Sequence, residues 1–372
     1  MSASAFPAEK LTQFARTALQ KTLGVKKGES VLIEAWTNTL PYAEVFQLEA
    51  RRMGAKPLIL FDSEPGYWQA VSATRPQELG TVGRAEWAAL ENADAYVYFW
   101  GPSDRPRLDS LPDKTREALT AYNAKWYKVT AKKHIRACRI ELALAEPPNA
   151  AQMGVDFERW REELMAASLI DPTTLAKYGG RFAGPLEKGR RLRITHPNGT
   201  DLVLGLKHRK AIVDDARIDA NDLRSENNVC SLPGGNLLLA LDESVAEGTL
   251  IANRPSRFDR IHTTHGGRWE FRDGKLADYK FEEGQEHFLK GFQKAPKGKE
   301  KPGILEIGLN PAVQDSPNWE DEELGVVTVY IGGNARYGGA TKIPYLSYLM
   351  VRGATLEVDG KTLLRGGVPV PK

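Results

Sequence analysis

Cysteine is scarce in this chain of 372 residues, which contains only Cys138 and Cys230. Two cysteines make neither a disulfide framework nor a Cys-x-x-Cys pair. The composition therefore excludes a small disulfide-stapled domain and is typical of the reducing cytoplasm. A cysteine nucleophile needs a neighbouring base or cation to form its thiolate. No partner histidine can be named for Cys230, so its role stays open, and a buried packing cysteine is the commoner case.

Long hydrophobic runs and an excess of one charge are also missing. No apolar run approaches the ~20 residues that cross a bilayer, and the N-terminal residues lack a signal-peptide pattern. Basic and acidic residues number 51 and 48, so the net charge of +3 provides no field that attracts nucleic acid. We therefore expect a cytoplasmic globular protein that binds neither membranes nor nucleic acids and is long enough for two domains.

The first half of the chain alternates helical and strand patterns. Apolar residues recur at helical spacing over residues 11–23, and a β-prone run follows over residues 31–36. Pro41 starts a second helix, which Gly54 ends, and further strands are expected around residues 57–61 and 95–100. Strands separated by helices predict a parallel sheet with helices on its faces. We expect an α/β domain over residues 1–184, with a Gly/Pro-containing connector at residues 179–185 at its end.

Beyond residue 184 the pattern changes to short strands. Residues 191–196 and 201–206 flank Pro197-Asn198-Gly199-Thr200, which is a hairpin signature. Similar short strands continue to the end of the chain, and only residues 282–292 have a helical pattern. We therefore predict a mainly β (α+β) domain over residues 185–372.

Two apolar strands near the C-terminus each lead into a Gly/Asn turn, at residues 304–310 and 325–334. Such strands display one or two side chains over a pocket. Glu306 is the candidate general base or lone metal ligand, and the alternative is a buried carboxylate paired with arginine or backbone amides. In the following loop, Arg336 can clamp a carboxylate and Tyr337 can donate to an oxyanion, unless the two are an ordinary exposed pair.

His262 and His265 form a His-x-x-His motif in a β-prone segment. Residues three apart in a strand point to opposite faces, which argues against a shared metal ion. If both histidines bound one ion, Glu306 would complete the two-histidine, one-carboxylate set typical of non-haem iron enzymes. A mononuclear metal site therefore remains an alternative.

Several short motifs, in the same order along nearly the whole chain, resemble the aminopeptidase T family of thermophilic-type metallo-aminopeptidases. Two of them are Leu232-Pro233-Gly234-Gly235-Asn236 and Leu305-Glu306-Ile307-Gly308-Leu309-Asn310. The resemblance implies a homodimer with an α/β N-terminal domain and a β-rich catalytic domain. It also implies two divalent cations held by two glutamates, two histidines, an aspartate and a tyrosine. The remaining matching segments are residues 25–33, 52–57, 247–249 and 271–276.

The ligand positions of that family are mostly altered in this chain. The resemblance places Asn236 where the family has its first glutamate, and Glu306 at the second. Thr328 stands where the family has a histidine, and the closing His-x-Asp falls within residues 345–348, which contain neither residue. Tyr337 corresponds to the tyrosine. A divalent ion takes about four to six ligands, mostly anionic or imidazole, so a two-metal centre is not expected here.

We therefore expect a diverged hydrolase of this family, acting without a cofactor on an amide-type bond of a small molecule or peptide. One alternative is a mononuclear iron ring-cleaving dioxygenase, since dihydroxypyridine dioxygenases resemble the same family, although they keep the His-x-Asp that this chain lacks. Another is a catalytically inert homologue that binds a small molecule. The alternative cofactor is a single iron or zinc ion. The predicted catalytic residues are Glu306, Tyr337 and Arg336; the predicted substrate-binding residues are Asn236, Thr328 and Tyr345; the candidate metal ligands are His262, His265 and Glu306.

Overall fold

The computed structural model describes residues 6–258, 262–314 and 316–371. The chain divides into two compact units, the first made of residues up to Pro172 together with Ala216–Gly234, the second of Thr173–Asp215 together with Gly235–Lys372. The boundary predicted between residues 184 and 185 falls inside helix α11 (Pro172–Lys188). No helix among the described residues is long and apolar enough to cross a membrane.

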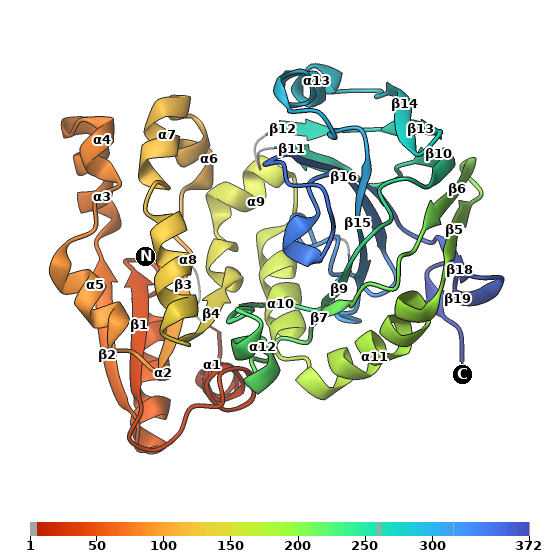
Figure 1. Ribbon diagram of the computed structural model, residues 1–372. Helices are drawn as coiled ribbons and strands as arrows, with labels where there is room; N and C mark the ends of the chain where they lie inside the picture. The colour runs from red at the N-terminus through yellow and green to blue at the C-terminus, as the bar shows by residue number, and fades with distance from the viewer. Residues whose placement is uncertain (1–5, 259–261, 315, 372) are drawn as a thin grey trace. The chain divides into compact units, whose positions relative to one another are not determined.

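The first unit, drawn mainly in red to yellow in Figure 1, is built on a five-stranded sheet in the order β2-β1-β3-β4-β8. Each neighbouring pair is parallel, as the alternating pattern predicts. The last strand, β8, comes from the late return of the chain to this unit. The strands are β1 (Ser30–Trp36), β2 (Lys56–Asp62), β3 (Ala95–Phe99), β4 (Arg136–Ile140) and β8 (Val229–Leu232).

Helices cover both faces of this sheet. On one face, the rings of Phe14 in α1 and Phe46 in α2 pack edge to face, and Phe46 also packs on Phe99 of β3. On the other face, Leu90 of α5 and Trp126 of α8 join a buried apolar cluster. Local signals fix the helix ends: Asp156, for example, is the N-cap of α10 and accepts a hydrogen bond from the Arg159 amide. The helices are α1 (Ala8–Arg16), η1 (Thr17–Thr22), α2 (Leu40–Arg52), α3 (Glu64–Ala73), α4 (Pro76–Leu79), α5 (Arg84–Glu91), α6 (Arg105–Asp109), α7 (Asp113–Leu119), α8 (Asn123–Lys132), η2 (Glu141–Leu144), α9 (Pro147–Met153), α10 (Phe157–Ser168) and α12 (Ala220–Arg224).

The second unit is mainly β, and the predicted combination of an α/β half and a β-rich half is confirmed. Its larger sheet has the order β14-β13-β10-β6-β5-β18-β19-β20, and its smaller sheet has the order β17-β16-β15-β9-β7. The hairpin predicted around Asn198-Gly199 joins β5 to β6. The strands are β5 (Arg191–His196), β6 (Thr200–Gly205), β7 (Ile212–Asp214), β9 (Asn236–Ala240), β10 (Ala246–Ile251), β11 (Ser256–Phe258), β12 (His262–Thr264), β13 (Arg268–Arg272), β14 (Lys275–Lys280), β15 (Pro302–Gly308), β16 (Val327–Gly332), β17 (Leu346–Val351), β18 (Thr355–Val358), β19 (Lys361–Arg365) and β20 (Val368–Pro369).

Two helices and a short turn accompany these sheets: α11 (Pro172–Lys188), α13 (Gln285–Lys294) and η3 (Ala335–Tyr337). The predicted Gly/Pro connector at residues 179–185 is wrong, because these residues lie within α11. A Cβ at Gly179 would collide with Val213, so this glycine permits close approach of strand β7 to the helix. Pro185 is tolerated in the last turn of α11. Gly179 therefore allows the helix to pack closely and does not mark a flexible connector.

Candidate functional site

On one face of the smaller sheet, polar side chains gather around Glu306, and the opposite face packs in the core. Leu305 and Ile307 of β15 are fully buried in the core, and Glu306 between them points to the opposite face. In the register of the sheet, Glu306 lies between Leu238 of β9 and Thr328 of β16. Because side chains alternate along a strand, Tyr330 shares the face of Glu306 and Thr328. The polar face is thus assembled from several strands around one carboxylate.

Glu306 is held by two neutral side chains. The Nδ2 group of Asn236 donates to Oε1 at 2.7 Å, and the Tyr330 hydroxyl donates to Oε2 at 2.6 Å. Only 2% of the residue is exposed. Burial raises the pKa of Glu306 well above its usual value, the nearby carboxylates Asp321 and Asp214 raise it further, and the two hydrogen bonds only partly offset this. Glu306 therefore keeps its proton at pH values where an ordinary glutamate is ionised, as an acid–base group requires.

Two further oxygen atoms of this face are buried without a hydrogen-bond partner among the described residues. They are Oγ1 of Thr328 and Oδ1 of Asn236. Buried polar atoms are normally satisfied, so an exception next to a functional group is a point where a ligand can bind. The Thr328 hydroxyl can donate a hydrogen bond, and the Asn236 carbonyl oxygen can accept one. The site thus offers a substrate one donor and one acceptor beside Glu306.

Tyr330, which contacts Glu306, is the tyrosine that our sequence analysis missed. It stands two residues after Thr328 in the same strand, and this period-two spacing is the signal that would have found it. Tyr337 lies in the η3 turn, where burial raises its pKa, Arg336 lowers it and Glu306 raises it. Arg336 itself is exposed, with its guanidinium 6.0 Å from the centre of the Tyr337 ring. Tyr337 is therefore within electrostatic reach of Glu306, whereas Tyr330 touches it.

The last strand of the smaller sheet places an aromatic side chain near Glu306. The ring of Tyr348 lies 5.2 Å from that of Tyr330, and its hydroxyl accepts a hydrogen bond from the Arg257 amide. The guanidinium of Arg257 is in turn paired with Glu320 at 2.8 Å. Tyr345, which we expect to bind substrate, lies against Phe292 of α13, with 6.1 Å between ring centroids.

The two histidines of the His-x-x-His motif are not brought together. His262 stacks on His287 of α13 with 4.0 Å between ring centroids, and His287 is paired with Glu286. His265 is exposed, and its backbone bridges to Glu283. This separation follows from the strand geometry of β12. Within residues 6–258, 262–314 and 316–371, no group of three His, Cys, Asp or Glu is arranged to hold a metal ion.

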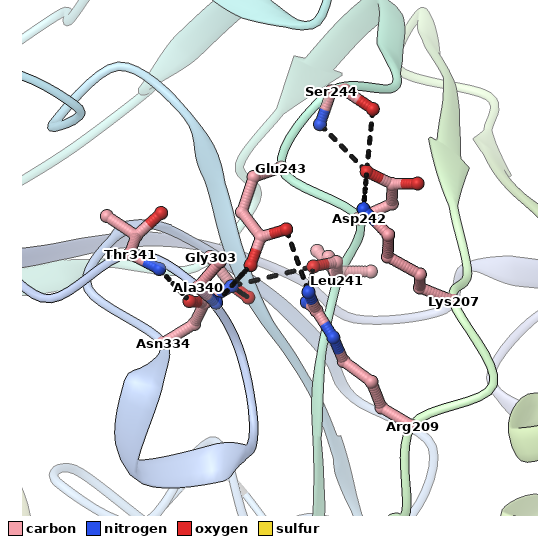
Figure 2. Close-up of polar contacts among 10 residues, drawn as sticks. All are labelled: Lys207, Arg209, Leu241, Asp242, Glu243, Ser244, Gly303, Asn334, Ala340 and Thr341. Atoms are coloured by element: carbon pink, nitrogen blue, oxygen red, sulfur yellow. Dashed lines mark hydrogen bonds and ion pairs between the residues drawn. The ribbon is translucent and has the colours of Figure 1, made fainter.

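The loop that carries Tyr337 is fastened to the sheet by a buried ion pair (Figure 2). Glu243, which follows β9, pairs with Arg209 at 2.8 Å and accepts hydrogen bonds from Asn334 Nδ2 at 2.8 Å and the Ala340 amide at 2.6 Å. Asn334 in turn accepts from the Thr341 amide at 2.9 Å. Burial opposes ionisation of Glu243, but Arg209, the Ala340 amide and Asn334 lower its pKa to about 2. Both ends of the loop are thereby held.

Replacing Glu243 with Gln is expected to destabilise the protein at pH 7 by about 3 kcal/mol. The folded state holds the pKa of Glu243 at about 2, below its usual value, and the variant leaves the buried guanidinium of Arg209 unpaired. The ionised carboxylate of Glu243 stabilises the wild type fully above about pH 4.3, the pKa of a glutamate in the unfolded chain. This stabilisation is lost as the pH falls towards 2, the pKa of Glu243 in the folded state. Urea unfolding at pH 7 and pH 3 measures this. Asp201→Asn, which removes an exposed ion pair with Arg193, is the control and should cost less than about 1 kcal/mol. An equal loss at both pH values would contradict the electrostatic account.

Comparisons of the sequence and of the fold with known proteins point to one family. The family model for thermophilic metalloprotease (M29) matches residues 7–300. Among solved structures, wild-type AmpT from Thermus thermophilus is 18% identical with a TM-score of 0.73, and the match covers 98% of this chain and 99% of that one. The 2,5-dihydroxypyridine dioxygenase from Pseudomonas putida KT2440 is 17% identical with a TM-score of 0.60, and 99% of each chain is covered. No curated protein sequence matches.

Proposed function

The chain belongs to the thermophilic metalloprotease (M29) family, and on this premise we propose that it is a diverged hydrolase that cleaves an amide-type bond of a small molecule or peptide without a two-metal centre. The observation that carries the proposal is the buried Glu306 carboxyl, held by Asn236 and Tyr330. The proposal includes a cytoplasmic location, in keeping with two buried free cysteines, and a homodimer.

The donor set at this site fits a pair of divalent ions poorly. Such a pair needs several anionic or imidazole ligands around each ion. Asn236 offers a neutral amide whose Nδ2 group already donates to Glu306, and Thr328 offers a neutral hydroxyl. Among the three residues that match family ligand positions on β9, β15 and β16, only Glu306 is anionic. We therefore derive the chemistry from the side chains themselves.

In the proposed reaction, ionised Glu306 takes a proton from the water that attacks the substrate carbonyl and then delivers it to the leaving amine. The raised pKa supports both steps, because it makes the ionised carboxylate a stronger proton acceptor than an ordinary glutamate and lets the carboxyl hold the proton until the amine takes it. Tyr330 orients the carboxyl through its hydroxyl. Thr328 donates to the oxygen that becomes negative in the transition state, and Asn236 accepts a hydrogen bond from the substrate.

The alternative of a mononuclear iron dioxygenase requires His262, His265 and Glu306 around one ion. The stacking of His262 on His287 and the exposure of His265 argue against it. The similarity to the Pseudomonas dioxygenase is a similarity of fold at 17% identity. The inert binder would use the same side chains around Glu306 as the proposed hydrolase and would differ only in turnover.

The proposal is tested by metal content together with turnover. The full chain is expressed with iron, zinc, cobalt and manganese, and bound metal per chain is measured by mass spectrometry. A panel of peptide and small-molecule amides is then assayed with and without EDTA. We expect well below one equivalent of metal and hydrolysis that EDTA leaves unchanged.

Two equivalents with EDTA-sensitive peptidase activity would overturn the metal-free mechanism. One equivalent that His262→Ala abolishes would favour the dioxygenase, and ligand-induced stabilisation without turnover would favour the binder.

A further inference from the structure

The two cysteines of the chain lie opposite one another on neighbouring strands of the first unit's sheet. Strands β4 and β8 are parallel, and their register pairs Cys138 directly with Cys230. Register partners in adjacent strands extend their side chains from the same face of a sheet. Both residues are free thiols and are buried, with 0% and 4% of their surface exposed. The sheet therefore holds two thiols side by side, although they are far apart in the sequence.

The spacing of the two strands is close to the spacing that a disulfide requires. Neighbouring strands lie about 4.8 Å apart, within the Cα separation of about 4.4 to 6.8 Å that a disulfide spans. The Cys230 thiol also points towards β4, because it donates a hydrogen bond to the Ala137 carbonyl at 3.7 Å. The usual Cβ separation across a disulfide, about 3.8 Å, is shorter than the strand spacing. Closing the bond therefore requires β8 to shift towards β4 by roughly 1 Å.

Strand β8 is the part of this sheet that can make such a movement. It has four residues, and among the described residues it is the end strand of the sheet, paired only with β4. A short strand that is paired on one side opens locally at a lower free-energy cost than a central strand does. Local opening of β8 therefore gives a small oxidant access to Cys230, and reclosure returns this residue to Cys138.

We propose that Cys138 and Cys230 are a redox-sensitive pair that closes reversibly to a disulfide and fastens β8 to β4 in the presence of a disulfide oxidant such as oxidised glutathione. The thiolate of Cys230 attacks one sulfur of oxidised glutathione, which forms a mixed disulfide and releases one glutathione. The thiolate of Cys138 then attacks the Cys230 sulfur of the mixed disulfide and releases the second glutathione. The two protein thiols are oxidised, the glutathione disulfide is reduced, and the thiol protons end on the glutathione molecules.

The bond joins the returning part of the chain to the body of the first unit. The chain leaves this unit after Pro172, and β8 lies in the returning segment Ala216–Gly234. A disulfide between β4 and β8 closes the long loop between them covalently, which disfavours the states in which β8 is detached from the sheet. The pair thus switches β8 between a strand that opens locally and one that is locked in place. This proposal is independent of the chemistry at Glu306.

Oxidised glutathione added to the full, folded chain tests whether the bond forms. Free thiols are counted by mass spectrometry after alkylation with N-ethylmaleimide in urea. We expect both cysteines to be labelled before oxidation and neither after it, with no bound glutathione, and dithiothreitol should restore both labels. Cys138→Ala is the control and should stop at the glutathione adduct on Cys230. A wild type that keeps both thiols, retains glutathione or forms disulfide-linked dimers would overturn the proposal.

The effect on β8 is measured by hydrogen exchange. The amides of Val229–Leu232 should exchange at least about tenfold more slowly in the oxidised chain than in the reduced chain, because the bond suppresses local opening. Strand β2 is the matched control, since it is the edge strand at the opposite end of the same sheet. Its amides should exchange equally fast in both forms. Equal exchange of β8 in the two forms, or slowing of both edge strands alike, would overturn the switch.

Discussion

Glu306→Gln is expected to lower kcat/KM by about 10²- to 10⁴-fold, the range that a positioned acid–base group contributes. Glutamine has nearly the shape of glutamate: its Oε1 can still accept the hydrogen bond of Asn236, and its Nε2 group can donate to the Tyr330 hydroxyl, which then accepts. It cannot gain or lose a proton, so only the chemical step is removed. The measurement is steady-state kinetics on an amide substrate from the panel. The control is Glu270→Gln on β13, a carboxylate paired with Arg268 in the other sheet, which should leave kcat/KM unchanged.

The same variant has a second, independent readout in stability. Because burial raises the pKa of Glu306 in the folded state, the wild type loses stability as the pH rises from about 4.3 through that raised pKa. The Glu306→Gln variant has no group to ionise there. It should therefore gain stability relative to the wild type between pH 5 and pH 8 in urea unfolding. A constant difference across this range would show that Glu306 is ionised throughout, and loss of activity would then need another explanation.

Much of the fold follows from local sequence patterns. The alternation of helices and strands before residue 180 predicted the parallel sheet, and the Asn198-Gly199 turn predicted the β5–β6 hairpin. The two apolar strands that lead into Gly/Asn turns also indicated where a side chain such as Glu306 is displayed. Helix α11 was missed because its glycines were interpreted as chain breakers, whereas the structure uses Gly179 for close packing against Val213. A glycine alone does not tell a flexible link from a close contact.

The candidate site was only partly accessible from the sequence. Glu306 and its neighbours in the matching motifs were identifiable, because they belong to local runs. Contacts that join distant segments were not, as in the stacking of His262 on His287 and the influence of Asp321 on Glu306. Such contacts depend on the path of a loop relative to the sheet, and this path cannot be predicted from the local patterns of a single sequence. Tyr330 was not considered for the same reason, because the residues that contact Glu306 become clear only when the strand faces are known.

Gly308 controls how the connector between β15 and β16 returns to Glu306. The connector folds back over the end of β15, where the Asn310 amide donates to the Glu322 carbonyl at 2.9 Å and the Gly325 amide donates to Gly308 at 3.0 Å. This return brings the carboxylate of Asp321 close enough to raise the pKa of Glu306. A Cβ at Gly308 would lie 2.7 Å from the Asp321 carbonyl oxygen and would collide with that of Glu323. Backbone atoms held by these hydrogen bonds cannot move aside cheaply.

Gly308→Ala is therefore expected to destabilise the protein by about 3 kcal/mol or more, at the upper end of the cost of overpacking, and to reduce turnover together with stability. Urea unfolding measures the first effect and kcat/KM the second. Gly180→Ala is the matched control: it lies in helix α11, where a Cβ meets nothing within 4 Å, and should be neutral or slightly stabilising. If Gly308→Ala unfolds like the wild type, the connector is free to move. The position of Asp321 would then not be fixed, and the raised pKa of Glu306 would have to come from burial and from Asp214.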